Sequence, residues 1–233
     1  MGLDKFVARE PRPLPIFVLA DTSGSMRGEK INELNLALRE MINALNSADD
    51  IRGKFQLSVI AFGGSVDIVQ PLTDISEITL SELTAAGNTP MGETFEVVKK
   101  MIEDRNVVSS RAYTPTIVLI SDGLPTDCSE EMYRRKNYFD WEPLKSLHSG
   151  ERSSRCQRLA LGIGEDADAD MLKAFIDNPE IPVIMLSSAG TSQKLKETLE
   201  LGALDFIQKP YTSDQIRQAV ERIRRKVEEN KNG

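Results

Sequence analysis

The sequence is poor in the residues on which several classes of enzyme depend. Its 233 residues include one histidine, His148, and two cysteines, Cys128 and Cys156. A Ser/His/Asp hydrolase would need His148 as its base, and catalytic zinc sites usually take several His or Cys ligands. His148 stands in a polar stretch, where we expect a surface loop. The cysteines are far apart and form no CxxC motif, so we expect free thiols and no enzyme of either class.

Long apolar runs and an excess of basic charge are also missing. No run approaches the roughly 20 apolar residues that span a bilayer. Residues 1–13 are charged and contain proline, unlike a signal peptide. The formal net charge of −7 disfavours non-specific binding to nucleic acid. We therefore expect a cytoplasmic globular protein that uses neither a membrane nor a nucleic acid as its partner.

Strand and helix patterns alternate along the chain. Continuous apolar runs at residues 14–20 and 116–120 predict strands that are covered on both faces. Helical spacing of apolar residues predicts helices over residues 30–45 and 91–102. Further strands are expected at residues 55–62, 66–69, 158–163, 181–186 and 205–208, and further helices at 141–147, 169–176, 192–201 and 213–229. This alternation predicts an α/β, Rossmann-like doubly wound fold, with a mostly parallel sheet and helices on both faces.

Oxygen-bearing side chains follow two of the buried strands. Asp21, Ser23 and Ser25 come directly after the first strand, and Asp122 comes after the strand at residues 116–120. Ligands gather at the carboxyl ends of strands in open α/β sheets, so we expect these groups at one edge. Thr89, in the loop before a helix, can be carried to the same edge. Two carboxylates and three hydroxyls suit a hard divalent cation such as Mg²⁺.

Each piece of this set has a simpler structural interpretation when it is taken alone. Asp21 and Ser23 can form a turn or a helix cap. Residues 121–123 can be a plain turn, and Thr89 can simply precede a helix start. The three pieces together favour the cation site.

A second acidic run does not form a calcium loop. Asp166, Asp168 and Asp170 lack the downstream glycine and the twelfth-position glutamate of an EF-hand. We expect this run to cap a helix that begins at Ala169.

The motifs Asp21-x-Ser23-x-Ser25, Thr89 and Ser121-Asp122-Gly123 resemble the metal-ion-dependent adhesion site of von Willebrand factor A domains. The resemblance covers roughly residues 13–183. It implies that five side chains surround Mg²⁺ or Mn²⁺, namely Asp21, Ser23, Ser25, Thr89 and Asp122. It also implies a protein partner whose acidic residue completes the coordination.

Within that family, several stretches look like the bacterial tellurium-resistance TerY type. They are residues 14–26, 71–73, 87–92, 121–127 and 161–164. This resemblance implies a stress-response setting that includes a protein kinase and a phosphatase.

The C-terminal segment resembles a different fold. Residues 182–189 and 201–210 look like the second half of a response-regulator receiver domain of the CheY type. The resemblance implies that Ser187 and Lys209 contact a phosphoryl group, and that the bond before Pro210 is cis. The acceptor aspartate of a receiver's first half is not visible.

We therefore expect three parts: an N-terminal tail at residues 1–12, a von Willebrand factor A-like domain at 13–180, and a receiver-like segment at 181–233 that continues the same sheet. Three functions stay open at this point. The chain is a cation-dependent binding module, a phosphorylated signalling protein, or an engineered chimera of two folds without a native role. The sequence sets neither the identity of the partner nor the oligomeric state.

Overall fold

A single sheet organises the protein. The computed structural model describes residues 11–48, 53–164, 167–178, 184–187 and 205–208. Its strands are β1 (Arg12–Asp21), β2 (Gly53–Gly63), β3 (Ser65–Asp74), β4 (Thr116–Ser121), β5 (Gln157–Ile163), β6 (Ile184–Ser187) and β7 (Asp205–Gln208). They form a 7-stranded sheet in the order β3-β2-β1-β4-β5-β6-β7. All neighbours are parallel except β2 and β3. The predicted fold class is confirmed.

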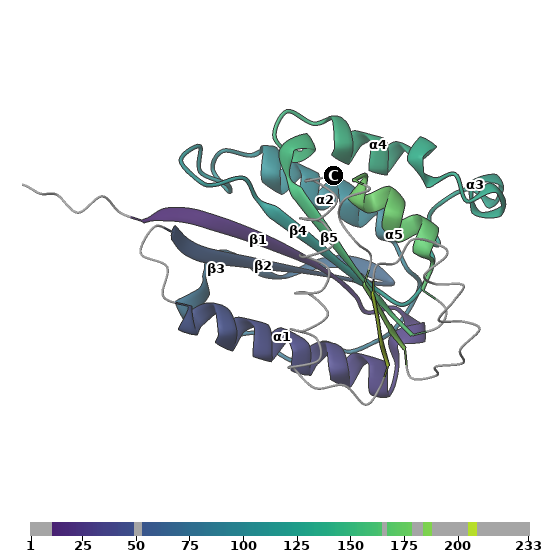
Figure 1. Ribbon diagram of the computed structural model, residues 1–233, viewed down its shortest axis with the longest axis horizontal. Coiled ribbons are helices and arrows are strands. Elements are labelled where there is room, and N and C mark those ends of the chain that lie inside the picture. The colour runs from purple at the N-terminus through teal and green to yellow at the C-terminus, as the bar shows by residue number, and fades with distance from the viewer. Residues whose placement is uncertain (1–10, 49–52, 165–166, 179–183, 188–204, 209–233) are drawn as a thin grey trace, which may run out of the picture.

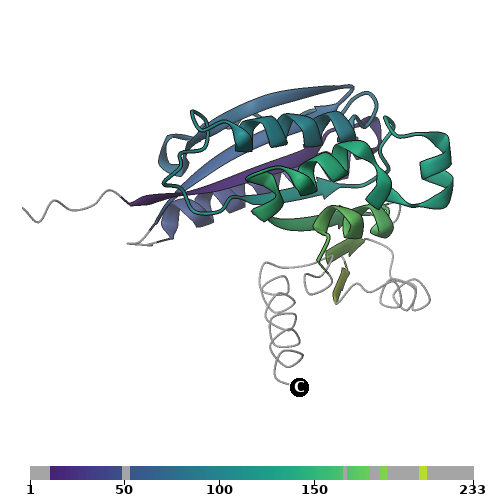
Figure 2. The same ribbon diagram turned by 90° about the horizontal axis from the view of Figure 1, so that it is seen from above.

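Helices cover both faces of this sheet (Figure 1). They are α1 (Glu29–Ser47), α2 (Met91–Glu103), α3 (Glu130–Arg135), α4 (Glu142–Ser149) and α5 (Ala169–Ile176). Helix α1 lies on one face, and α2, α4 and α5 lie on the other. Figure 2 shows these three helices next to one another over the strands. Short 3₁₀ turns follow β1 and precede β5, namely η1 (Gly24–Met26) and η4 (Ser153–Arg155).

The alternation of side chains along β1 explains its continuous apolar run. Phe17 and Leu19 belong to the cluster that packs under α2, α4 and α5. Val18 and Ala20 point to the opposite face and belong to the cluster under α1. All four are fully buried. A strand that is covered on both faces needs apolar residues at every position, as the sequence pattern predicted.

Strand β3 is longer than the pattern at residues 66–69 predicted. It continues through Pro71 to Asp74. Proline is tolerated because β3 is the edge strand, where a missing N–H donor breaks no ladder on the open side. Register shifts in its pairing with β2, between Leu57 and Ile60, also break the simple period-two alternation.

Strands β6 and β7 extend the sheet beyond β5. Leu161 of β5 pairs with Ile184, and Ile184 pairs with Asp205, both in parallel register. The strand expected at residues 205–208 is confirmed, and the one expected at 181–186 appears as Ile184–Ser187. The helices expected at 192–201 and 213–229, together with Lys209 and Pro210, lie outside the described residues. In the described part of the chain, no helix combines the length and apolarity that crossing a lipid bilayer requires.

The expected loop position of His148 is wrong. His148 lies in the last turn of α4, and its side chain is only 15% exposed. Its Nε2 lies 3.0 Å from the carbonyl oxygen of Phe175 in α5. The polar composition of this stretch does not reveal that His148 faces the neighbouring helix α5. Cys128 and Cys156 are free thiols, as predicted.

Candidate metal centre

The pairing of β1 with β4 brings the two motif-bearing strand ends together. Ala20 pairs with Ile120, so Asp21 and Ser121 follow side by side at the carboxyl edge. The hydroxyl of Ser121 donates to Oδ2 of Asp21 at 2.6 Å. The backbone N–H of Gly123 donates to the same hydroxyl oxygen at 3.2 Å. The first strand end is therefore fixed to the second through a serine.

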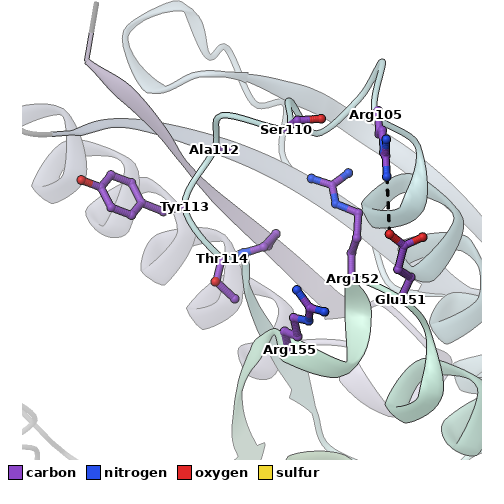
Figure 3. Close-up of a pocket in the computed structure, with 9 residues that line it drawn as sticks. Arg105, Ser110, Ala112, Tyr113, Thr114, Glu151, Arg152 and Arg155 are labelled. Carbon is purple, nitrogen blue, oxygen red and sulfur yellow. Dashed lines mark hydrogen bonds and ion pairs between the residues drawn. The ribbon is translucent and has the colours of Figure 1, made fainter.

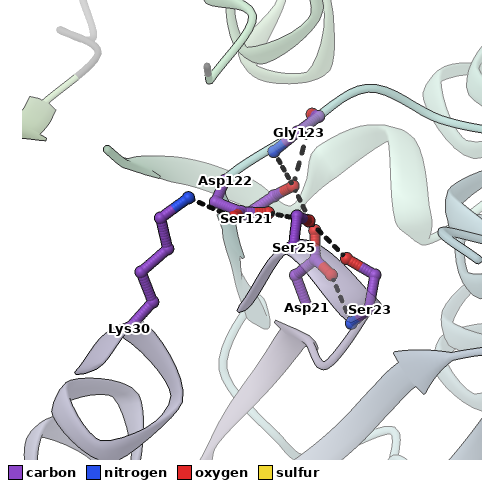
Figure 4. A network of polar contacts seen from close by, with 7 residues as sticks. All are labelled: Asp21, Ser23, Ser25, Lys30, Ser121, Asp122 and Gly123. Atoms are coloured by element: carbon purple, nitrogen blue, oxygen red, sulfur yellow. Dashed lines mark hydrogen bonds and ion pairs between the residues drawn. The ribbon is translucent and has the colours of Figure 1, made fainter. Parts of the chain in front are cut away.

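A chain of oxygens crosses this junction (Figure 4). The backbone N–H of Ser23 donates to Oδ1 of Asp21 at 2.9 Å, which shapes the turn after β1. The Oγ atoms of Ser23 and Ser25 are 3.0 Å apart. Ser25 Oγ donates to Oδ1 of Asp122 at 2.7 Å. Since each hydroxyl has a single proton, Ser23 is then the donor to Ser25.

Two carboxylates are buried at this point. Asp21 and Asp122 are each 0% exposed. Burial raises the pKa of Asp21, hydrogen bonds from Ser121 and Ser23 oppose the rise, and the negative charge of Asp122 adds to it. Two neighbouring buried carboxylates are costly unless positive charge compensates them.

Lys30 supplies part of that positive charge. Its Nζ lies 2.6 Å from Oδ2 of Asp122, and its side chain is 26% exposed. The ammonium comes from the first turn of α1, on the opposite side of Asp122 from Ser25 (Figure 4). One oxygen of Asp122 is thus occupied by Lys30, and the other faces the serines.

Thr89 belongs to a loop that is held against the turn after β1. The N–H of Gly24 donates to the carbonyl oxygen of Gly87 at 2.9 Å, and Ala86 N–H donates to Thr22 O at 2.8 Å. Thr89 itself is 6% exposed, and its N–H donates to Thr126 Oγ1 at 3.0 Å. Within the described chain its hydroxyl makes no hydrogen bond. The backbone therefore brings Thr89 to the same edge, while its Oγ1 stays outside the network of the other four.

A glycine pair makes this close loop packing possible. Gly87 has a φ of +75°, which favours glycine, and a Cβ there would lie 2.5 Å from the Cα of Gly64. The N–H of Gly64 donates to the carbonyl of Asn88 at 2.8 Å. Two glycines therefore let the loops after β2 and before α2 approach each other beside the site.

The donor set fits a hard divalent cation. Among the described residues, no three His, Cys, Asp or Glu side chains converge on one point, so hydroxyl oxygens have to contribute. Mg²⁺ and Mn²⁺ accept carboxylate, hydroxyl and water oxygens, whereas Zn²⁺ sites usually use nitrogen and sulfur. A cation here would also offset the two buried carboxylates.

Ser121 and Lys30 are the residues that the site prediction omitted. Ser121 was part of the Ser-Asp-Gly motif, and its role follows once β1 and β4 are placed side by side. Lys30 carries no motif. It is the second residue of α1, so its partner Asp122 becomes visible only when α1 and β4 are packed together.

Comparisons with known proteins agree with this fold. Residues 16–124 match the family model described as von Willebrand factor type A domain. The inter-alpha-trypsin inhibitor heavy chain H4 of Sus scrofa is 28% identical over 123 residues, which make up 49% of this chain and 13% of that protein. The match therefore spans a small part of this curated relative.

Two solved structures are similar at low sequence identity. The manganese-loaded TRAP protein of Plasmodium vivax has a TM-score of 0.53 and 20% identity, covering 82% of this chain and 74% of that chain. Proximal thread matrix protein 1 from the mussel byssus, with a zinc occupied MIDAS motif, has a TM-score of 0.51 and 18% identity, covering 82% and 46%. At such identities the likeness shows the fold.

Proposed function

Because residues 16–124 match the family model of the von Willebrand factor type A domain, we propose that the chain is a cation-dependent protein-binding module. Its site consists of oxygen donors from three loops at one sheet edge, namely Asp21, Ser23, Ser25, Thr89 and Asp122. The observation that carries the proposal is the row of oxygens from Ser23 through Ser25 to Asp122, next to the buried carboxylate of Asp21.

Each part of the chain has a distinct task in this proposal. The hydroxyls of Ser23, Ser25 and Thr89 would hold Mg²⁺ or Mn²⁺ directly, and the two carboxylates would hold it directly or through ordered water. The bound cation would supply a concentrated positive charge that accepts a carboxylate of a partner protein. The metal-loaded states named for the two similar structures support a divalent cation here.

Lys30 makes this site suitable for an anionic partner. Two carboxylates would by themselves neutralise a divalent cation. Because Lys30 is paired with Asp122, the site with its cation would keep an excess of positive charge. A glutamate or aspartate side chain of the partner would then complete both the coordination and the charge balance.

We propose a binding role and not a catalytic one. The single histidine, His148, packs between α4 and α5 against the carbonyl of Phe175 and so is not available as a base at the Asp21 edge. Ser25, which donates to a carboxylate at this edge, is itself one of the proposed cation ligands.

We also propose a cellular setting and a role for the C-terminal segment. The proposal of a cytoplasmic stress-response system of the TerY type is supported by the sequence motifs alone. The receiver-like character of residues 181–233 and the division at residue 180 likewise rest on sequence resemblance. The parallel addition of β6 and β7 to the sheet supports a segment that continues the first domain.

Titration with Mn²⁺ tests the cation site. Loss of the free Mn²⁺ signal in electron paramagnetic resonance measures binding to the intact chain. We expect one saturable site, lost in Ser25→Ala and retained in Ser65→Ala, whose exposed hydroxyl only contacts Asp67. A short glutamate-containing peptide should then bind only when the cation is present. Equal Mn²⁺ binding by both variants would contradict the proposal.

A further inference from the structure

A cavity of about 350 Å³ opens at the amino ends of the strands, opposite to the candidate metal centre at their carboxyl ends. Thr114, one of its lining residues, lies two positions before the start of β4, and Arg155 lies two positions before β5. Asp122, by contrast, follows the end of β4. A strand of this length rises about 20 Å, so the two sites are separated by the length of strand β4.

The cavity is lined by three guanidinium groups and one carboxylate. The arginines are Arg105, Arg152 and Arg155, and the acid is Glu151. Ser110 and Thr114 add hydroxyl groups from the segment that leads into β4 (Figure 3). This local excess of positive charge stands out in a chain with a formal net charge of −7.

Arg152 is held in place by the fold. Its Nη1 donates to the carbonyl of Ile102 at 2.7 Å, and its Nη2 donates to the carbonyl of Ser109 at 3.4 Å. Its backbone N–H donates to both carboxylate oxygens of Glu103 at 3.1 Å. A guanidinium has five N–H donors, so three donors of Arg152 stay available for a ligand. The side chain is therefore oriented before any ligand arrives.

Arg155 has no side-chain partner within the described chain, although it lines the same cavity. Arg105 has one weak partner, because its Nη2 lies 3.4 Å from Glu151 and both side chains are largely exposed. Such exposed pairs contribute little to stability, so the arginines are not explained by an ion-pair network. Arg152 and Arg155 stand at the start and the end of the η4 turn, and Figure 3 shows both side chains beside this turn.

We propose that this basic pocket binds the phosphate group of a small phosphorylated molecule. The planar fork of arginine matches phosphate oxygens in pairs, and two such forks with adjoining hydroxyls form a suitable donor set. The volume lies within the range of small-molecule sites. The guanidinium of Arg12 covers one face of the neighbouring Tyr113 ring, 4.0 Å from the ring centroid. We therefore expect the phosphate beside Arg152 and Arg155 and not against this ring face.

Calorimetric titration of the full chain tests this proposal. The probes are inorganic phosphate, glycerol 3-phosphate and AMP, with acetate as the carboxylate comparison. A chelator is present throughout, so that a bound divalent cation cannot capture the phosphate at the other edge. We expect one saturable site for the phosphate-bearing probes. Absence of saturation with all three would overturn the proposal.

Two matched variants separate the pocket from general charge. Arg155→Gln should weaken binding about tenfold or more, the usual loss for a hydrogen bond to a charged group. Arg134→Gln makes the same charge change on α3, where the side chain is 73% exposed, and should leave the affinity unchanged. Equal weakening by both variants would mean diffuse attraction and would refute the pocket. If Arg155→Gln failed to fold, Arg105→Gln would serve instead, with Arg134→Gln as the same control.

Discussion

Lys30 Nζ lies 2.6 Å from Oδ2 of Asp122, while Oδ1 of the same carboxylate accepts a hydrogen bond from Ser25 at 2.7 Å. The carboxylate is fully buried and is shared between an ammonium on one side and a hydroxyl on the other. Lys30 therefore compensates the buried charge when no cation is bound. It also repels any cation that binds on the serine side.

Replacing Lys30 by methionine should separate these two effects. Without divalent cations the variant should lose about 1–3 kcal/mol of unfolding free energy, because Asp122 remains as a buried carboxylate without its ammonium. Its affinity for Mn²⁺ should rise about tenfold, because a like charge near the site has been removed. Its affinity for the glutamate-containing peptide in saturating Mn²⁺ should fall.

Lys145→Met is the matched control for this prediction. Lys145 pairs with Asp140 at 3.0 Å, but both side chains are at least half exposed. This change should alter neither stability nor Mn²⁺ affinity appreciably. Denaturant unfolding and Mn²⁺ titration of the two variants give the comparison, and an unchanged Mn²⁺ affinity in Lys30→Met would contradict the assigned role of Lys30.

Asp21→Asn should remove the charge of Asp21 and leave the local structure in place. The amide oxygen can still accept from Ser23 N–H, and the amide nitrogen can donate to Ser121 Oγ. Because burial raises the pKa of Asp21, removal of its charge should leave the melting temperature without cations equal or higher. The increase in melting temperature on adding Mg²⁺, expected for the wild type, should disappear. A full Mg²⁺ response in the variant would exclude Asp21 from the site.

Gly87→Ala should destabilise the protein more than Gly28→Ala. Both glycines have positive φ, +75° and +82°, so an alanine at either position has backbone strain of about 1–3 kcal/mol. Only at Gly87 would the new Cβ also lie 2.5 Å from the Cα of Gly64, whereas nothing lies within 4 Å at Gly28. Urea unfolding of the two variants measures the difference. Equal losses would show that the loops do not pack as described.

His148 should make stability fall as the pH decreases. Burial lowers the pKa of His148 below 6.5, the charge of Arg158 lowers it further, and the contacts with Phe175 and Asp177 only partly offset this. A depressed pKa means that the unfolded chain binds the proton more readily. The stabilisation by neutral His148 is thus complete above pH 6.5 and is lost as the pH falls through the lower folded-state value.

The single histidine makes this prediction easy to check. Its one imidazole C2–H signal in proton NMR gives the pKa of the folded state directly. His148→Gln, whose amide can still donate to Phe175 O, should remove this part of the pH dependence. A folded-state pKa at or above 6.5 would contradict the described packing of α4 on α5.

Periodicity predicted the strands and helices of the described chain because most of them are covered by neighbours. Phe17, Val18, Leu19 and Ala20 are all buried, so their strand is visible as an apolar run. Helix α3 was not predicted because none of its residues is buried, and no apolar period marks it. The N-cap at Asp168 was visible, since an acid directly before an apolar helix has few other roles. Its side chain accepts from the N–H groups of Asp170 and Met171.

The placement of the candidate ligands was predictable where they follow strand ends. Asp21 and Asp122 each come directly after a buried strand, and the topology brings neighbouring strand ends together. The role of Ser121 depends on the β1–β4 register, and that of Lys30 depends on how α1 packs. Neither role can be inferred from the residues that are adjacent in the sequence. His148 was misplaced for the same reason, since its partner Phe175 is distant in the sequence and contacts it only after packing.

Anomalous diffraction from crystals grown with Mn²⁺ would locate the bound cation directly. We expect one strong anomalous peak among the hydroxyl oxygens of Ser23, Ser25 and Thr89, beside Asp21 and Asp122. The hydroxyl of Thr89, which makes no hydrogen bond within the described chain, should then be a ligand. A peak elsewhere, or none at saturating Mn²⁺ with Ser25 still bonded to Asp122, would contradict a cation-dependent binding site at this edge.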